Sequence, residues 1–236
     1  IPKGTLIFPG KPKKPARYYQ EDIARKAPMI RRATIVKATG SGKTRTAGEI
    51  IRTLRLPTLF LTDSRLLLNQ TAKSLNEVLN IPIGKVGGRY FDIQPVTVAT
   101  VQTIRAILTE GDKDTLDVKA LKNEINAAKA LFNGLPIKTD DKREAIIRLL
   151  AQTELLIVDE AHTLGADTIY QVASLPEPSL AFGLTATPQR EDEKNIYIEA
   201  ATGPIWKPIS EEELIEKGYL LPVKVWVIPF KHNRKY

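Results

Sequence analysis

Seven consecutive residues, Ala38-Thr39-Gly40-Ser41-Gly42-Lys43-Thr44, constrain the fold of this chain more than any other segment. They follow a short β-rich run at 33–37 and precede a segment with helical spacing. Glycines let the backbone curve closely around a phosphate chain, and the positive end of the following helix favours an anion. The pattern predicts a strand–loop–helix unit that binds a polyphosphate. We expect its contacts to come from Thr39, Gly40, Ser41, Gly42, Lys43 and Thr44.

Two side chains of this loop have specific expected roles. Lys43 would supply a point charge for the β- and γ-phosphates, and Thr44 a hydroxyl for Mg²⁺. Lys37 departs from the strict pattern, which has Gly or Ala at that position. The alternative is a surface turn that happens to contain Lys and Thr. The strand before the loop and the helix after it argue against that alternative.

Short β-rich runs alternate with segments of helical spacing along the rest of the chain. The helical spacing is clearest at 66–79 and 146–151. This alternation predicts an α/β fold, with a parallel sheet covered by helices on both faces. The predicted strands are 33–37, 58–62, 96–101, 155–159 and 180–185.

Composition excludes several classes of function. There is no cysteine, so disulfide scaffolds, cysteine metal sites and thiol catalysis are excluded, and only His162 and His232 could serve a histidine site. The net charge of +8 favours a polyanionic partner. No apolar run approaches the roughly 18 residues of a membrane span, and no signal-peptide pattern is present. We therefore expect an intracellular protein of the cytoplasm, nucleoid or nucleus, without a membrane partner.

The chain divides into three expected parts. Residues 1–16 read as a basic, proline-rich lead-in rather than core, and 17–222 as one lobe. An insertion at about 105–152 is expected to form two or more amphipathic helices on the edge of the sheet. Residues 223–236 are expected to leave toward an absent second lobe. Because the first residue is Ile rather than Met, we expect the chain to be a piece of a longer protein.

The C-terminal part of the lobe carries a helix signature. Ser210-Glu211-Glu212-Glu213 has the pattern of a capping box, and Gly218 suits the end of the helix that follows. A strand-like run at 223–228 comes next.

An acidic pair ends the apolar run at 155–158. Buried parallel strands present ligand-binding groups at their carboxyl ends, which is where Asp159 and Glu160 fall. Asp159 suits Mg²⁺, through water, and Glu160 suits the orientation and deprotonation of an attacking water. An ordinary strand end with solvated carboxylates is the alternative, and the phosphate-binding loop earlier in the chain argues against it.

Asp159-Glu160-Ala161-His162 resembles the DEAH box of superfamily 2 helicases and translocases. The other motifs of that superfamily's first motor lobe follow in order. Arg17-Tyr18-Tyr19-Gln20 resembles its R-x-Y-Q element, and the segments 62–70, 99–103 and 183–190 resemble motifs Ia, Ib and III. The segments 203–204 and 218–222 resemble the part of the chain that leaves this lobe in DNA-directed members.

The resemblance implies a RecA-like lobe that uses ATP and Mg²⁺. It implies that Arg17 and Gln20 contact adenine, and that Lys43, Asp159 and Glu160 are catalytic. Nucleic-acid phosphates would be contacted by Thr62, Arg65, Thr100 and Gln102. The two sites would be coupled through His162, Thr185 and Thr187. A second RecA-like lobe would supply arginines that complete the ATPase site, so the lone lobe is expected to hydrolyse ATP poorly.

Several alternatives stay open at the level of sequence. The motif forms favour DNA, but an RNA helicase lobe or an ATP-gated nucleic-acid-binding module without translocation would carry the same motifs. Thr100 and Gln102 could cap a helix, Arg65 could be a solvated charge, and His162 could be structural. Motif Ia often has Glu where this chain has Leu66.

Overall fold

The protein is described by a computed structural model over residues 6–109, 116–132, 134–161, 167–187 and 195–222. Its centre is an eight-stranded sheet with the order β4-β3-β5-β2-β6-β7-β1-β8. The strands are β1 Arg32–Val36, β2 Thr58–Thr62, β3 Gly84–Gly87, β4 Tyr90–Asp92, β5 Val96–Thr100, β6 Leu155–Asp159, β7 Leu180–Thr185 and β8 Ile205–Trp206.

Helices occupy the connections between these strands. They are α1 Tyr18–Ile30, α2 Lys43–Leu54, α3 Arg65–Leu79, α4 Val101–Leu108, α5 Val118–Phe132, α6 Lys142–Gln152, α7 Asp167–Ala173, α8 Asn195–Thr202 and α9 Glu211–Glu216. No helix in these ranges is long and apolar enough to cross a membrane.

The five predicted strands are present and pair in parallel, which confirms the α/β prediction. The sheet as a whole is nevertheless mixed, because β4 pairs antiparallel with β3 at one edge. Sequence reasoning missed β3 and β4, and it also missed β8, which pairs with β1 through only two residues. These strands are short and give little periodicity.

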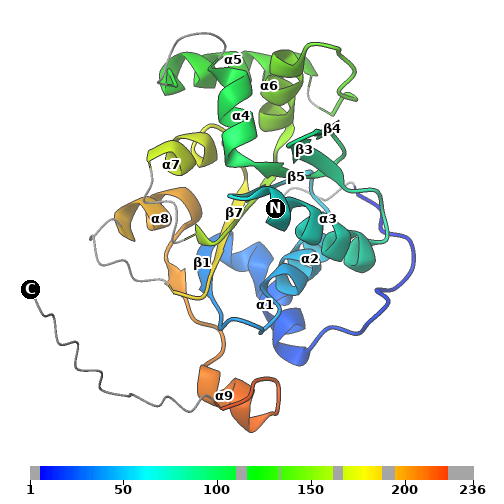
Figure 1. Ribbon diagram of the computed structural model, residues 1–236, viewed down its shortest axis with the longest axis vertical. Coiled ribbons are helices and arrows are strands. Elements are labelled where there is room, and N and C mark those ends of the chain that lie inside the picture. The colour runs from blue at the N-terminus through cyan, green and yellow to red at the C-terminus, as the bar shows by residue number, and fades with distance from the viewer. Residues whose placement is uncertain (1–5, 110–115, 133, 162–166, 188–194, 223–236) are drawn as a thin grey trace, which may run out of the picture.

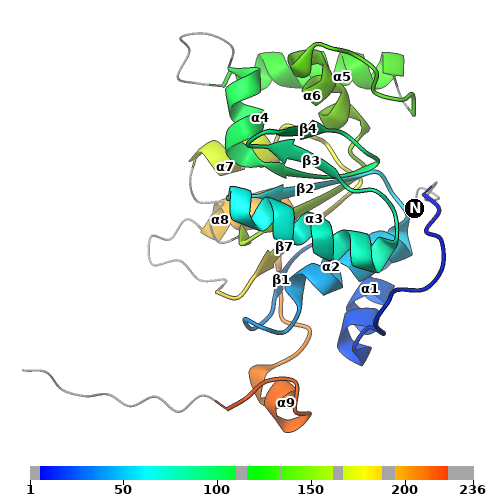
Figure 2. The same cartoon turned by 45° about the vertical axis from the view of Figure 1, so that its right-hand side comes forward.

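Alternate residues of each central strand enter two separate hydrophobic clusters. In β6, Leu155 and Ile157 pack with α1, α2 and α3, whereas Leu156 and Val158 pack with α4 through α7. Both faces of the sheet are thus buried, and for this reason the strands read as continuous apolar runs. Figures 1 and 2 show the two helical layers on opposite sides of the sheet.

The predicted insertion helices correspond to α5 and α6. They are expected to pack on the edge of the sheet, and Lys142 Nζ of α6 lies 5.6 Å from the centre of the Phe91 ring in the edge strand β4. Leu121, Ile125 and Ile146 join one buried cluster with Leu59 of β2 and Leu156 of β6. Phe91 of the edge strand β4 packs against the same cluster, and Figure 2 shows α5 and α6 beside β4 at that edge of the sheet.

The described part of the lead-in lies against the lobe. Leu6 and Phe8 are half-buried against the first cluster. The Leu6 amide donates to the Arg55 carbonyl at 3.0 Å, and Asn80 Nδ2 donates to the Pro9 carbonyl at 3.0 Å. Arg55 and Asn80 are the residues that directly follow α2 and α3.

The C-terminal helix has the predicted ends. Ser210 Oγ accepts from the Glu213 amide at 3.1 Å. Gly218 has φ +71°, which lets the Tyr219 amide turn back to the Leu214 carbonyl at 2.8 Å. The predicted strand-like run at 223–228 lies outside the described residues.

Candidate nucleotide and nucleic-acid sites

The phosphate-binding loop connects β1 to α2, as the sequence predicted. Gly40 and Gly42 both have φ +79°, a conformation that side chains disfavour. A Cβ on Gly42 would also lie 2.7 Å from Gln20 Nε2. Both glycines are therefore required by the backbone, and Lys43 opens the helix directly after them.

The start of α1 docks on this loop. Tyr19 Oη donates to the Ser41 carbonyl at 2.7 Å, and Gln20 Nε2 reaches the same oxygen at 3.4 Å. Arg17 Nη1 donates to Tyr19 Oη at 2.9 Å, and its amide donates to Gln20 Oε1 at 3.0 Å. The structure thus gathers Arg17 and Gln20 beside the loop, although their contact with adenine remains a prediction.

The acidic pair faces the loop from β6. Lys43 Nζ lies 3.2 Å from Glu160 Oε1. The two groups come from connections that follow β1 and β6, with β7 between them in the sheet. Carboxyl ends of parallel strands share one edge, so residues 117 positions apart in sequence meet there.

The backbone at Glu160 is strained. Its φ is +47°, a region that non-glycine residues seldom occupy and that costs on the order of 1–3 kcal/mol. The Glu160 amide donates to Asp159 Oδ1 at 3.1 Å. With this turn the Glu160 carboxylate reaches Lys43, while the Asp159 carboxylate accepts from the Glu160 amide.

Electrostatics at the site favour a divalent cation. Burial, and then the Glu160 charge, raise the pKa of Asp159 to about 6. A bound cation would offset the cost of burying the charged Asp159 carboxylate. This carboxylate and the Thr44 hydroxyl are oxygen donors of the kind that Mg²⁺ prefers. Within the described ranges no three His, Asp or Glu residues form a metal cluster. A cation here would therefore keep water or phosphate ligands, as Mg²⁺ does.

Thr185 at the end of β7 lies between the loop and the acidic pair. It is fully buried, and its hydroxyl accepts from the Thr187 amide at 3.1 Å. Its carbonyl accepts from the Lys37 amide at 2.9 Å, which ties the end of β7 to the start of the loop. His162, the third predicted coupling residue, lies outside the described residues.

The predicted nucleic-acid residues gather on the neighbouring strands. Thr62 and Thr100 are register partners at the ends of β2 and β5, and both are buried. Thr62 Oγ1 has no hydrogen-bond partner among the described residues. Arg65 and Gln102 are exposed at the starts of α3 and α4. Thr100 precedes α4, but its hydroxyl bonds to Thr103 Oγ1 at 2.8 Å rather than capping the helix.

Sequence reasoning missed two parts of this edge of the sheet. The first is the β3–β4 turn, where a Cβ on Gly88 would lie 3.5 Å from Arg65 Cδ. The Gly87-Gly88 pair, which follows Val86 and stands just before Arg89 and Tyr90, is a turn signal that could have revealed it. The second is the position of the segment after α9, which the sequence related to the exit from the lobe but did not place beside the loop. The Tyr219 ring lies 4.8 Å from the Arg17 guanidinium, and a Cβ on Gly40 would lie 3.6 Å from Leu220 Cδ2.

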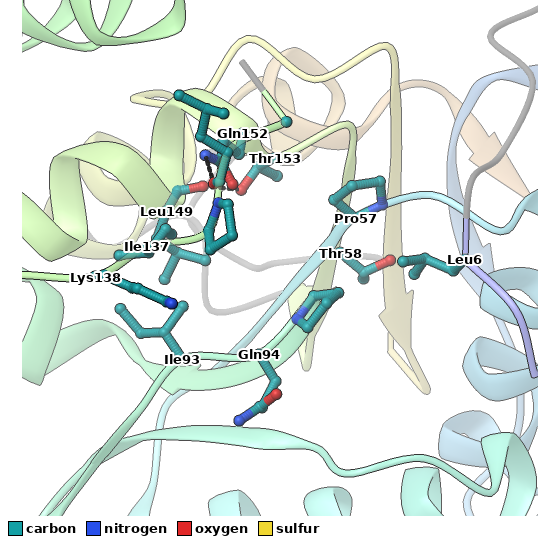
Figure 3. A pocket seen from close by; sticks show the side chains of 14 residues that line it. Leu6, Pro57, Thr58, Ile93, Gln94, Ile137, Lys138, Leu149, Gln152 and Thr153 are labelled. Atoms are coloured by element: carbon teal, nitrogen blue, oxygen red, sulfur yellow. Dashed lines mark hydrogen bonds between the residues drawn. The ribbon is translucent and has the colours of Figure 1, made fainter. Parts of the chain in front are cut away.

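A cavity of about 410 Å³ lies at the other end of the sheet. Residues Pro57 and Thr58 at the start of β2 line it, together with Pro95 before β5 and the insertion residues Ile137 and Lys138 (Figure 3). It is mainly apolar and contains neither the glycine loop nor the acidic pair. It is therefore not the phosphate site.

Comparison with known proteins gives consistent matches. The family model described as "Type III restriction enzyme, res subunit" matches residues 13–190, which covers more than half of the chain. The DNA 3'-5' translocase XPB2 of Sulfurisphaera tokodaii is 28% identical over 222 residues, or 94% of this chain and 42% of that protein. The putative DNA 3'-5' helicase Rad25 of Halobacterium salinarum is 26% identical, over 92% of this chain and 31% of that protein.

A solved structure shares the fold. The UvsW helicase of bacteriophage T4 matches with a TM-score of 0.56 and 19% identity, over 86% of this chain and 64% of that chain. The chain spans less than half of the length of the two curated relatives described above.

Proposed function

This chain belongs to the family of type III restriction enzyme res subunits, and on that premise we propose that it is the ATP-binding motor lobe of an ATP-dependent DNA helicase or translocase. Its RecA-like fold and its motifs are those of the first lobe of superfamily 2 helicases. The names of the two curated relatives support DNA, rather than RNA, as the nucleic acid that this lobe binds.

One observation carries the proposal. Lys43 of the glycine loop and Glu160 of the acidic pair lie 3.2 Å apart at the carboxyl edge of the sheet. A phosphate group bound in the loop would take Lys43 as its partner and release Glu160. A phosphate-binding group and a general base would then face the same reacting group.

The proposed roles rest on this contact and on the resemblance of the motifs. The loop amides, Lys43 and the start of α2 bind the β- and γ-phosphates. Thr44 and Asp159 hold Mg²⁺, which neutralises phosphate charge when bound. Glu160 orients a water and accepts its proton as the oxygen attacks the γ-phosphorus and the bond to ADP breaks. Arg17 and Gln20 contact the adenine.

DNA would lie across the neighbouring strand ends. Arg65 and Gln102 are exposed there, and Thr62 and Thr100 are buried at the ends of β2 and β5. Such groups bind phosphates and carry no base specificity. A second RecA-like lobe would supply the arginines of the ATPase site, an addition worth roughly 10³–10⁵ in rate in related enzymes.

Nucleotide binding by the 236-residue chain tests the assignment. We expect Lys43→Ala to lose at least tenfold in ATP affinity by calorimetry. Lys119→Ala, an exposed lysine on α5, serves as the control and should bind as the wild type does. Equal affinity of the Lys43 variant and the wild type would contradict the role of the loop.

A second substitution separates binding from chemistry. Glu160→Gln cannot accept a proton and no longer pairs electrostatically with Lys43, so we expect ATP affinity to be kept or increased. In the longer protein that carries the proposed second lobe, DNA-stimulated hydrolysis should fall by at least 10²-fold. Unchanged turnover would assign activation of the water to another residue.

A further inference from the structure

Lys37 is a buried cation behind the phosphate-binding loop. Its side chain is 1% exposed, and its Nζ donates to Thr46 Oγ1 in the first turn of α2. The same ammonium lies 4.6 Å from the centre of the Tyr19 ring. Tyr19 in turn bonds to the Ser41 carbonyl of the loop. Lys37 is thus enclosed by α1, α2 and the loop itself.

No carboxylate balances this charge within the described residues. The charged groups that act on Lys37 are the cations Arg17 from the start of α1 and Lys43 from the start of α2. The neutral groups that face it are the Tyr19 ring and the Thr46 hydroxyl. A buried ammonium with cations as neighbours is unfavourable, and burial followed by these two charges lowers its pKa to about 7.

An anion in the loop would change this balance. The loop begins at the residue after Lys37, and the Gly42 carbonyl accepts from Thr46 Oγ1, the group that Lys37 contacts, at 3.2 Å. A triphosphate on the other side of this backbone would bring several negative charges to a region that now holds three cations. Charge on Lys37 would then be favourable.

Resting on the nucleotide site proposed above, we propose that Lys37 is a positioning residue that binds a proton when a nucleoside polyphosphate enters the loop. The protonated ammonium then bonds to Thr46 and attracts the phosphates through the loop backbone. Nucleotide affinity is therefore linked to proton uptake by a residue at the position that this motif usually gives to Gly or Ala.

The linkage has a definite sign. Near pH 8 most Lys37 side chains of the free protein are neutral, so binding must take up close to one proton. Affinity should then fall by up to tenfold per pH unit between pH 7.5 and 9. At pH 6.5 and below Lys37 is mostly charged before binding, and this contribution disappears.

Calorimetric titration of the 236-residue chain with Mg-ATP at pH 8 tests the inference. Titrations in two buffers of different ionisation enthalpy give the number of protons taken up. We expect a value near one for the wild type and near zero for Lys37→Met. Lys85→Met is the matched control, because Lys85 also lies over a tyrosine ring, 3.8 Å from the centre of Tyr90, and it should keep the wild-type uptake.

Lys37→Arg keeps the cation but does not deprotonate in this range. It should bind Mg-ATP without proton uptake and with an affinity that stays flat from pH 7.5 to 9. If the wild type takes up no proton on binding, the inference is overturned. It is also overturned if Lys37→Arg still takes up a proton. Failure of the wild type to bind Mg-ATP at all would instead overturn the proposed function. The proton uptake of the wild type tests the inference even if Lys37→Met does not fold.

Discussion

Asp159 shows at the scale of one residue how the burial of a carboxylate costs stability. Its folded pKa of about 6 is higher than the ordinary value of 3.8. Between these values the folded chain binds more protons than the unfolded chain. The contribution of Asp159 to the free energy of unfolding is therefore most favourable below pH 4, and it becomes less favourable as the pH rises from 4 to 6. The cost at neutral pH is on the order of 2–3 kcal/mol.

Asp159→Asn should remove this cost. We expect the variant to be more stable than the wild type at pH 7.5 in buffer free of metal and nucleotide, and the difference to be clearly smaller at pH 4.5. Denaturant unfolding at both pH values measures the difference. Asp140→Asn, at an exposed position before α6, should show no such change. Equal stability of the wild type and Asp159→Asn at both pH values would show that Asp159 is not destabilised by burial.

Individual residues also show what the sequence can and cannot predict. Lys43 and Glu160 could be placed together because their types and flanking patterns are local signals. The burial of Lys37 could not be predicted, because Tyr19 and Thr46 enclose it only after α1 and α2 pack. The contact of Tyr219 with Arg17 depends on the path of the chain after β8, which no local pattern encodes.

At the scale of elements, the insertion is part of the core. Ile146 of α6 is fully buried in the second cluster, whereas Leu131 of α5 is 71% exposed. Ile146→Ala should lower the free energy of unfolding by about 2–5 kcal/mol, because it leaves a cavity under the helical layer. Leu131→Ala should change it by less than about 0.5 kcal/mol. Urea unfolding of both variants measures this contrast, and a small effect at Ile146 would mean that α6 unfolds independently of the sheet.

The elements that sequence reasoning found differ from those it missed in length and position. The five predicted strands are buried on both faces, and burial imposes continuous apolar runs that are visible in the sequence. Strands β3, β4 and β8 lie toward the edges of the sheet, where pairing needs few residues and tolerates Gly84 and Gly87. The insertion was recognised as helical, but how its helices pack on one another and beside β4 depends on contacts between distant residues.

At the scale of the whole molecule, the proposed DNA track can be tested with salt. Arg65→Ala should weaken binding of single-stranded DNA about equally for all base sequences. It should also reduce the log–log salt slope by about 0.7–0.9, the value for one phosphate contact. Titration of fluorescent DNA at several salt concentrations measures both quantities.

Arg25→Ala is the control for this experiment. Arg25 lies on α1 with a side chain that is 76% exposed, and it pairs with Asp22. Its loss should leave the slope unchanged. A slope unaffected by Arg65→Ala, or a loss confined to one base sequence, would mean that Arg65 is a solvated charge or a base reader.

The contact between Arg17 and Tyr219 has a structural consequence. The first helix of the lobe and the segment that leaves it meet beside the phosphate loop, with Leu220 against Gly40. The residues just after α9 are therefore coupled by two contacts to the proposed nucleotide site. If the nucleotide binds as proposed, a displacement of Tyr219 and Leu220 would alter the surroundings of Arg17 and of the loop at Gly40.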